Sequence, residues 1–190
     1  PKQYFLYKNK ELFEQSVTKA IKSKLFKKII LIVDNPKKIK KKYGNNVLII
    51  KGGKQRSDSS LIALKAIKRY SPNNVLIHDA ARPDFSIKLL KTLVKELKIN
   101  MSVIPVTLPS DSLKYKSNNQ LFNLKKENSY LTQTPQGFNY KELYNLAIRE
   151  KNNISDESTL FIDNEKKLKF IKGERKNKKI TFKDDITKQK

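Results

Sequence analysis

Short apolar runs recur between residues 28 and 106, and each is nearly uninterrupted and rich in β-branched residues. They lie at residues 28–33, 46–50, 74–77 and 101–106. Such runs are typical of strands buried on both faces. Between them, apolar residues recur at helical spacing at residues 13–21, 61–67 and 90–97. Strands that alternate with helices through short connections predict an α/β domain, with a mostly parallel sheet and helices on both faces.

The stretch at about 111–128 departs from this alternation. Apolar and polar residues alternate weakly there around Ser117-Asn118-Asn119-Gln120, a centre rich in turn-forming residues. This pattern predicts a two-stranded β-arm that leaves the sheet. An isolated hairpin is marginally stable in water, so the arm either packs on its own domain or docks on a second subunit. After the arm we expect a helix over 140–147 and strands at 168–171 and 180–182.

Length and composition place residues 1–190 in one domain, because 190 residues can bury a single core and no composition break divides them. The absence of cysteine excludes disulfides, a thiolate nucleophile and cysteine-ligated zinc, and one histidine excludes a histidine metal cluster. Apolar runs of about five residues, such as 29–33, fall far short of the ~20 that span a bilayer, and no secretory leader opens the chain. We therefore expect a soluble, cytoplasmic protein without a membrane partner.

The formal charge of +24 raises the question of nucleic-acid binding. However, only five of the 42 basic residues are arginine, the side chain best suited to bidentate phosphate and base contacts. Lysine, asparagine and isoleucine are abundant together throughout, which indicates compositional drift at exposed positions. The lysine-rich stretch 37–42 is interpreted as a solvated face. We expect nonspecific polyanion affinity at low salt and no specific nucleic-acid partner.

Polar clusters follow several of the predicted strands. His78 to Pro83, H-D-A-A-R-P, follows the run 74–77 and places Asp79 and Arg82 where ligands bind in open α/β sheets. A plain strand-to-helix loop with a surface ion pair is the alternative. The glycine pair of 52–59 allows close backbone approach, and residues after it can cap a helix whose free N–H groups suit anions. Gln133 to Phe138 ends the strand after the arm, and residues 177–181 carry a lysine into a short strand.

Five motifs in this order and spacing resemble the 2-C-methyl-D-erythritol 4-phosphate cytidylyltransferase family of the non-mevalonate isoprenoid pathway. They are G-G-x-x-R-x-D-S (52–59), H-D-A-A-R-P (78–83), Q-T-P-Q-G-F (133–138), S-D-E-S (155–158) and N-K-K-I-T (177–181). The resemblance covers essentially the whole chain and implies a Rossmann-like nucleotidyltransferase fold. Ala81 favours methylerythritol phosphate, because relatives that use pentitol phosphates usually carry a bulkier residue there.

The resemblance also implies a reaction. Methylerythritol phosphate attacks the α-phosphorus of CTP in line and releases pyrophosphate, with Mg²⁺ present. Such a transfer needs alignment and charge stabilisation rather than a covalent nucleophile. Lys2 matches the family's transition-state lysine, and Lys179 matches the lysine that positions the attacking phosphate. Gly53, Lys54 and Ser59 match the residues that contact cytosine.

On the same basis, Asp79 is expected to hold substrate hydroxyls or hydrated Mg²⁺, and Arg82 to orient the erythritol phosphate. Lys141 stands where a substrate-phosphate arginine is expected just after T-P-Q-x-F, and it offers a point charge without the bidentate fork. Asn123 stands near a threonine that the arm offers to the neighbouring subunit. The resemblance thus implies a homodimer that exchanges arms.

Family members carry a buried strand and an L-A-A-G-x-G-x-R loop before P-K-Q, and this chain starts at Pro1 of that motif. Loss of a central strand is expected to leave ladder groups of its neighbours unpaired. Two hypotheses from different classes follow: an N-terminally shortened form of a working cytidylyltransferase, or a catalytically inactive scaffold or binding protein of the same fold. A basic nucleic-acid-binding protein is a distant third. Whether a cyclodiphosphate synthase domain follows Lys190 is left open.

Overall fold

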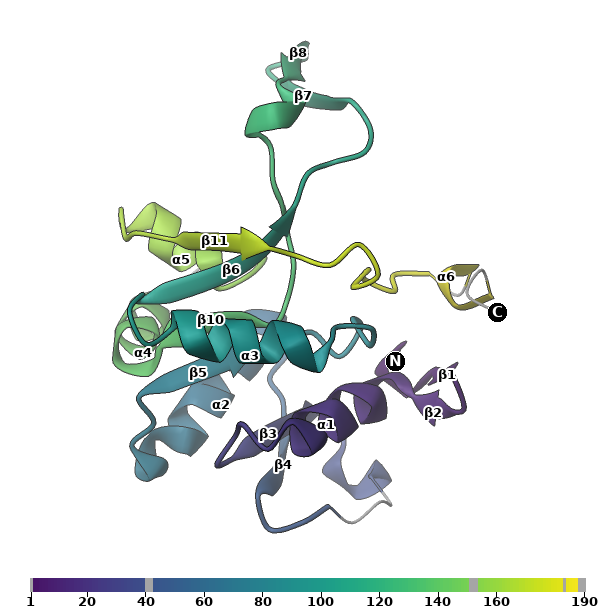
Figure 1. Cartoon of the computed structure of the whole chain (residues 1–190), viewed down its shortest axis with the longest axis vertical. Helices are drawn as coiled ribbons and strands as arrows, with labels where there is room; N and C mark the ends of the chain where they lie inside the picture. Colours follow the sequence, from purple (N-terminus) through teal and green to yellow (C-terminus); the bar gives the residue numbers. More distant parts are fainter. Residues whose placement is uncertain (1, 40–42, 151–153, 183, 188–190) are drawn as a thin grey trace.

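A central sheet covered by helices on both faces forms the body of the protein, and a two-stranded arm projects from it (Figure 1). The computed structural model describes residues 2–39, 43–150, 154–182 and 184–187. Its strands are β1 (Leu6–Tyr7), β2 (Lys10–Glu11), β3 (Ile29–Val33), β4 (Val47–Lys51), β5 (Asn74–Ile77), β6 (Ser102–Thr107), β7 (Leu113–Ser117), β8 (Gln120–Leu124), β9 (Leu131–Thr132), β10 (Gln136–Asn139) and β11 (Lys169–Lys172). Its α-helices are α1 (Leu12–Ser23), α2 (Arg56–Ile67), α3 (Ile87–Glu96), α4 (Tyr140–Arg149), α5 (Ser158–Asp163) and α6 (Asp184–Thr187).

The strands of the body form two ladders. The larger sheet has the order β11-β6-β10-β5, with β9 paired to β6. In it β11 runs parallel to β6, whereas β10 runs antiparallel to both neighbours. The second ladder joins β3 and β4 in parallel. Among the described residues β3 pairs only with β4, and β5 pairs only with β10.

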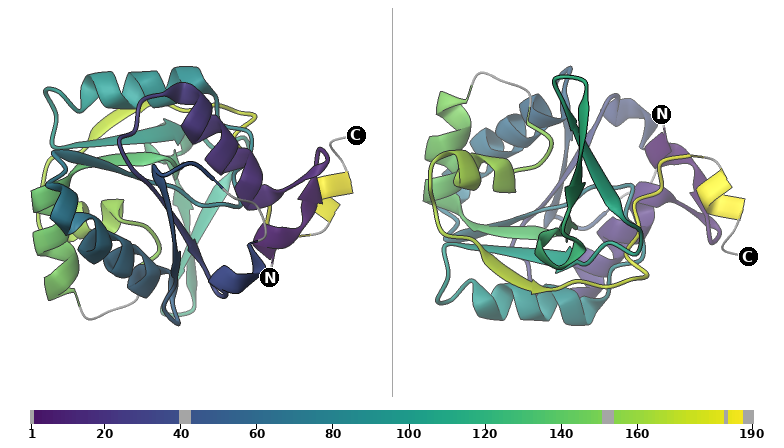
Figure 2. Two further views of the ribbon diagram at one scale, coloured as in Figure 1. Left: turned by 90° about the horizontal axis from the view of Figure 1, so that it is seen from below. Right: turned by 90° about the horizontal axis from the view of Figure 1, so that it is seen from above.

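Side chains that alternate along the strands fill a separate core on each face. Ile104 of β6 and Phe138 of β10 pack against α2, α4 and α5. Val103, one position away on β6, packs against α3 on the other face. Gly137 follows the same alternation, because a Cβ there would lie 2.7 Å from Leu97 Cδ1 beneath α3. Figure 2 shows α3 on one side of the sheet and α2, α4 and α5 on the other, which confirms the predicted two-sided cover.

The predicted arm is present and stands away from the body (Figure 1). Asn118 and Asn119 have φ of 46° and 65°, so both turn residues between β7 and β8 adopt the left-handed conformation that suits the twist of a two-residue hairpin. All residues of β8 are exposed. Tyr115 and Phe122 face each other across the ladder and expose 54% and 47% of their surface. The arm therefore buries little against its own chain.

Some local predictions differ from the structure. Gln133 to Phe138 does not end a strand: it leaves β9 and continues into β10, because Gln136 pairs with Ile77 of β5. Residues 180–182 form no strand. The Ile180 N–H donates to the Ala81 carbonyl, which ties this segment to a loop rather than to a ladder.

Other segments were not anticipated or cannot be compared. The β1–β2 hairpin, α5 and α6 had no clear periodic signal because they are so short. In the lysine-rich stretch 37–42, Pro36–Lys38 forms a 3₁₀ turn, and residues 40–42 lie outside the described residues. Within the described part of the chain, no helix has both the length and the apolar character needed to cross a bilayer.

Candidate active site

Two loops that follow the carboxyl ends of strands β5 and β4 form the site. One follows β5 and begins with His78 and Asp79, and a turn closes it where the Arg82 N–H donates to the Asp79 carbonyl at 3.0 Å. The other follows β4, passes through Gly52 and Gly53, and leads into α2 at Arg56. Both loops lie at one edge of the sheets, where α/β proteins bind ligands.

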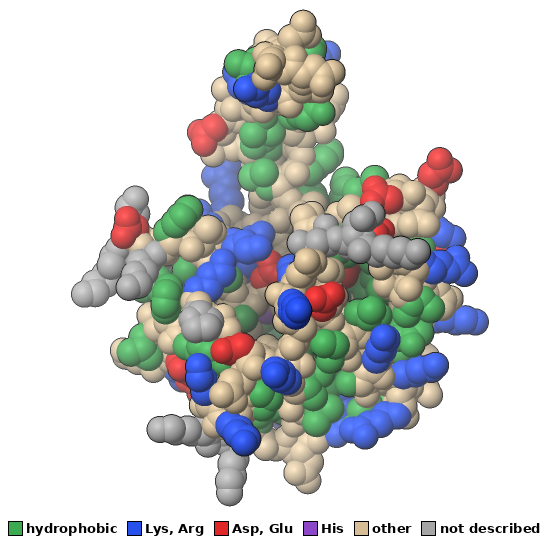
Figure 3. All heavy atoms as spheres, turned by 180° about the vertical axis from the view of Figure 1, so that it is seen from behind, with side chains coloured by type: hydrophobic (Ala, Val, Ile, Leu, Met, Phe, Trp, Pro, Cys, Tyr) green, Lys and Arg blue, Asp and Glu red, His purple; other side chains and the backbone are tan. Residues whose placement is uncertain are grey.

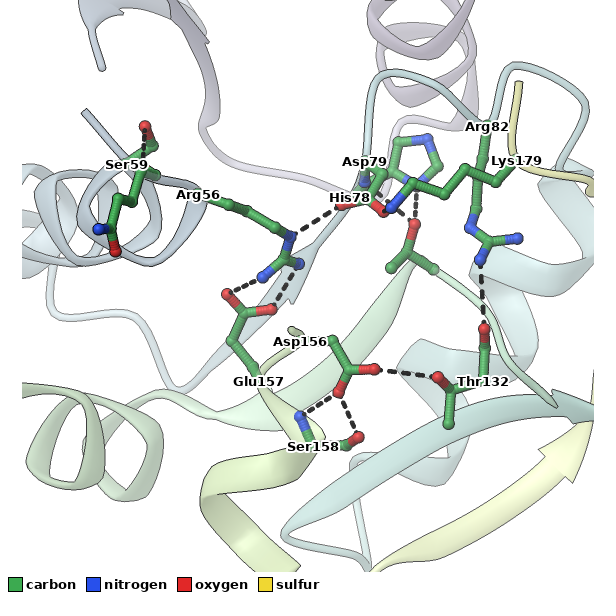
Figure 4. A network of polar contacts seen from close by, with 12 residues as sticks. Arg56, Ser59, His78, Asp79, Arg82, Thr132, Asp156, Glu157, Ser158 and Lys179 are labelled. Atoms are coloured by element: carbon green, nitrogen blue, oxygen red, sulfur yellow. Dashed lines mark hydrogen bonds and ion pairs between the residues drawn. The ribbon is translucent and has the colours of Figure 1, made fainter. Parts of the chain in front are cut away.

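Asp79 lies between two cations (Figure 4). Its Oδ1 accepts from Arg56 Nε at 3.1 Å, and its Oδ2 lies 3.0 Å from Lys179 Nζ. Burial alone would raise the pKa of Asp79, but Arg56 and Lys179 outweigh burial and hold this pKa below its ordinary value. Asp79 is therefore ionised at neutral pH. The structure brings together two of the predicted residues, Asp79 and Lys179, although they are far apart in sequence.

Arg56 connects Asp79 to a second carboxylate. Its Nη1 and Nη2 donate to Glu157 Oε1 and Oε2 at 2.9 and 2.8 Å, a bidentate pair. The Glu157 side chain, just before α5, is only 2% exposed. Burial would lower the pKa of Arg56, and the two carboxylates raise it above its ordinary value. From the sequence alone, no role was assigned to Arg56 and Glu157, although both lie in the motifs named above. The presence of both motifs in one chain does not show that these two side chains are in contact.

Arg82 lies in the same loop but points away from Asp79. Its Nη1 donates to the Asn177 carbonyl at 3.0 Å and its Nη2 to the Thr132 carbonyl at 3.2 Å, so it clamps the segment before Lys179 to β9. Burial lowers the pKa of Arg82. Its Nε is buried and has no hydrogen-bond partner among the described residues. In this conformation Arg82 holds the loop in place, and only part of its guanidinium is left without a hydrogen-bond partner.

His78 anchors the loop to α1 and to Thr134. Its Nε2 lies 3.1 Å from Ser16 Oγ and its Nδ1 lies 3.1 Å from Thr134 Oγ1. Thr134 Oγ1 also accepts from the Asp79 N–H at 3.0 Å. Burial lowers the pKa of His78 to about 4, so the ring is neutral at pH 7. This histidine is a structural member of the site rather than a proton donor.

The glycine turn adopts a tight conformation before α2. The Gly53 N–H donates to Ser59 Oγ at 3.1 Å, and the Ser59 hydroxyl donates to the Gln55 carbonyl at 3.1 Å. A Cβ on Gly53 would lie 2.3 Å from Asp58 Cβ, so no other residue fits without displacing the start of α2. Gly53 and Lys54 are exposed. Figure 4 shows Ser59 set apart from Asp79, with Arg56 between them.

The other predicted residues occupy three separate places. Lys2 lies in a 3₁₀ turn, Lys2–Tyr4, whose Tyr4 hydroxyl donates to Asp34 just after β3. The Gly52 N–H donates to the Val33 carbonyl, so the 3₁₀ turn that contains Lys2 and the glycine turn both lie at the end of β3. Asn123 is on the arm and accepts from Lys114 Nζ at 2.6 Å.

Lys141 lies at the other end of the sheet. It follows β10, whose last residue Asn139 pairs with Asn74 at the start of β5, whereas Asp79 follows the end of β5. The Tyr140 N–H also donates to the Asn73 carbonyl. The role of Lys141 in substrate binding stays a prediction. From this position Lys141 would not reach a substrate that is bound at Asp79 of the same chain.

The metal prediction for Asp79 can be compared with the donor atoms present. No group of three or more histidine, aspartate or glutamate side chains that could hold a metal occurs in the described part of the chain. Both Asp79 oxygens already pair with Arg56 and Lys179. The protein residues therefore do not form a metal cage by themselves. A lone carboxylate fits Mg²⁺ only where phosphates and water supply the other ligands.

Comparisons with known proteins point to one family. The sequence model of the family "IspD: 2-C-methyl-D-erythritol 4-phosphate cytidylyltransferase" matches residues 1–190. A "Bifunctional enzyme IspD/IspF" from Pelagibacter ubique is 48% identical over 188 residues, which is 98% of this chain and 51% of that protein. A "2-C-methyl-D-erythritol 4-phosphate cytidylyltransferase" from Caldicellulosiruptor bescii is 31% identical, over 98% of this chain and 86% of the relative.

Solved structures show the same likeness. The 4-diphosphocytidyl-2C-methyl-D-erythritol synthase of Anaerococcus prevotii has a TM-score of 0.88 at 27% identity, over 97% of this chain and 90% of that one. The bifunctional IspDF of Campylobacter jejuni has a TM-score of 0.83 at 29% identity, over 98% of this chain and 48% of that one. The chain thus spans about half the length of the bifunctional relatives described here.

Proposed function

Because the chain belongs to the 2-C-methyl-D-erythritol 4-phosphate cytidylyltransferase family, we propose that it transfers CMP from CTP to methylerythritol phosphate and releases pyrophosphate. The observation that carries the proposal is the ionised Asp79 held between Arg56 and Lys179 at the carboxyl end of β5. Cations and an oriented carboxylate are what a reaction between two phosphate-bearing substrates requires.

The chemistry is an in-line displacement at the α-phosphorus. The substrate phosphate oxygen forms the new P–O bond, and the bond to the β-phosphate oxygen breaks, so pyrophosphate leaves with its electron pair. Lys179 is proposed to position the attacking phosphate and Lys2 to stabilise charge on the reacting phosphate. Lys179 is 41% exposed while it pairs with Asp79, so it can exchange this partner for a substrate anion.

The glycine turn is proposed to hold the cytosine. Gly53 and Lys54 are exposed, and their backbone groups are suited to read the edge of a base. Ser59 is proposed as a third contact. Its hydroxyl already bridges Gly53 and Gln55, so it also fixes the shape of the turn that the base would meet.

Asp79 is proposed to accept hydrogen bonds from substrate hydroxyls, and Arg82 to orient the erythritol phosphate through the part of its guanidinium that the loop leaves uncommitted. Mg²⁺ is proposed to arrive with the triphosphate of CTP, with Asp79 as the carboxylate available to its hydration shell. When bound, the ion would supply charge neutralisation at the phosphates.

The arm is proposed to form a homodimer and to bring Asn123 to the site of the second subunit. Its support is the exposed apolar surface of β7 and β8 and the lack of packing on its own body. A cytoplasmic location is part of the same proposal.

The specific nucleic-acid alternative is less favoured. Figure 3 shows lysine and arginine side chains spread over one face among apolar and other residues, rather than gathered in a stripe. A scaffold without activity remains the rival to be tested.

The test is release of pyrophosphate with CTP, methylerythritol phosphate and Mg²⁺. It uses the 190-residue chain beside a version extended before Pro1 by a strand and glycine-rich loop of the family type. We expect activity in the extended version, reduced about 10²–10³-fold in kcat by Lys179→Met and unchanged by Lys91→Met, an exposed lysine of α3. Absence of pyrophosphate release from both versions would overturn the proposal in favour of the scaffold.

A further inference from the structure

A basic pocket lies beside the start of α3, outside the cluster around Asp79. It has a volume of about 560 Å³ and is lined by Lys8, Lys19, Asp84, Phe85, Ser86, Ile87, Lys176 and Lys178. This volume is within the usual range for small-molecule sites. In Figure 1 the segments that line it surround the right-hand end of α3: the β1–β2 turn and α1 below, and the stretch after β11 above.

The lysines converge from separate segments and outnumber the carboxylates. Lys8 comes from the β1–β2 turn, Lys19 from α1, and Lys176 and Lys178 from the stretch after β11. Among the described residues, the side chains of Lys176 and Lys178 have no hydrogen bond or ion pair. Burial lowers the pKa of Lys19, the effect of Asp84 opposes this, and Lys8 and Lys176 lower it further, so these charges act on one another.

The two carboxylates near the pocket are already committed. Asp84 Oδ1 lies 2.9 Å from Lys8 Nζ, and its Oδ2 accepts from the Tyr7 hydroxyl. Glu174 accepts from the Ser86 N–H at 2.8 Å and from the Ser86 hydroxyl. Four lysines and one carboxylate, Asp84, therefore line the pocket, and the second carboxylate, Glu174, lies beside it at Ser86, so an excess of positive charge is left at the site.

The backbone separates this pocket from the Asp79 cluster. In the stretch 176–179 the side chain of Asn177 is fully buried and donates to the Thr134 carbonyl at 2.8 Å. Lys176 and Lys178 line the pocket, whereas Lys179 reaches Asp79. Phe85 and Ile87 add an apolar wall, and Lys19 Nζ lies 5.1 Å from the centre of the Phe85 ring.

We propose that this pocket binds a small phosphate ester, with the phosphate held by Lys176 and Lys178 together with Lys8 and Lys19, and the organic part packed on Phe85 and Ile87. Lysine is a common point-charge ligand of phosphate, and a dianion gains more from converging cations than a monoanion does. The volume of the pocket is that of a small-molecule site, and its apolar wall consists of Phe85 and Ile87 alone, which favours a small molecule over a polymer. The site is separate from the reaction proposed above and does not depend on it.

The test is isothermal titration of the 190-residue chain at constant ionic strength with inorganic phosphate, phenyl phosphate and, as a monoanion, acetate. We expect saturable binding that is tighter for phenyl phosphate than for inorganic phosphate and absent for acetate. K176Q/K178Q should weaken phenyl phosphate binding about tenfold or more. The matched control K91Q/K95Q removes two exposed lysines of α3 and should leave the affinity unchanged.

A second variant separates this pocket from the Asp79 cluster. Lys179→Gln should leave phenyl phosphate binding unchanged. Loss of binding in Lys179→Gln with retention in K176Q/K178Q would assign the phosphate to the Asp79 cluster and overturn the proposal. Equal loss in K176Q/K178Q and K91Q/K95Q would show general charge attraction and overturn it as well. The urea midpoint of each variant confirms that it is folded.

Discussion

Arg56→Met tests the ion pair that connects the β4–α2 loop to α5 and Asp79. The substitution removes both donors to Glu157, whose side chain is 2% exposed, and one donor to Asp79, whose side chain is 16% exposed. Breaking a buried pair by removing one partner costs about 3–5 kcal/mol, because the remaining charge stays buried without compensation. Arg56 itself is 28% exposed, so water reaches part of the pair and we expect the lower end, about 3 kcal/mol.

The assay is urea unfolding at pH 7 with a double-mutant cycle. Glu157→Gln removes the stranded charge, so R56M/E157Q should be about 1–2 kcal/mol more stable than R56M alone. Arg175→Met, at an exposed arginine, is the control and should stay within about 0.5 kcal/mol of the parent. The reasoning is refuted if R56M costs under about 1 kcal/mol, or if E157Q adds its own cost to R56M instead of relieving it.

Three further predictions concern pH, the glycine turn and the arm. His78 has a pKa of about 4 in the folded protein against about 6.5 unfolded, so the unfolded state binds more protons between these values. The free energy of unfolding should therefore fall by about 2 kcal/mol from pH 7 to pH 5, and urea titrations should show this fall in the parent but not in His78→Gln. The lowered pKa of Asp79 affects the free energy of unfolding in a different pH range: the stabilising contribution of this carboxylate is lost only as the pH falls below about 4. Gly53→Ala forces a Cβ into Asp58, at 2.3 Å, and should raise KM for CTP about tenfold or more in the pyrophosphate assay; Gly44→Ala, where the nearest contact is 3.4 Å, should not. L121S/F122S changes two exposed residues of β8, so it should turn a dimer into a monomer in analytical ultracentrifugation while its far-UV circular dichroism spectrum stays that of the parent; a parent that sediments as a monomer refutes the proposed role of the arm.

The elements that sequence patterns predicted well are those in which burial decides the pattern. The runs at 28–33, 46–50, 74–77 and 101–106 became β3, β4, β5 and β6, because their apolar side chains pack into the cores beneath the helices. Strands β5 and β6 contribute side chains to the cores on both faces of the sheet. The direction of β10 was not predictable in the same way. Gln136–Asn139 is short and lies between β5 and β6. Its antiparallel direction depends on how the chain returns to the sheet after the arm, and not on the residues of β10 themselves.

The site shows the same division between local and long-range information. The position of Asp79 after a buried strand was visible in the sequence, and so was the glycine turn before α2. The partners of Asp79 were not all visible. Lys179 was selected by its motif alone, and Arg56 was given no role, because a contact across 23 residues has no signature in either segment.

Arg56 is the residue that ties these separate motifs into one structure. It begins α2 directly after the glycine turn, contacts Asp79 after β5, and pairs with Glu157 before α5. A movement of the start of α2 would therefore disturb the contacts of Arg56 with Asp79 and Glu157. If the base is held at Gly53 and a substrate hydroxyl at Asp79, as proposed above, the same side chain would position both substrates. Arg56→Lys keeps the charge and loses the bidentate fork, so it should raise KM for both substrates together. An increase confined to one substrate would show that the two loops are positioned independently.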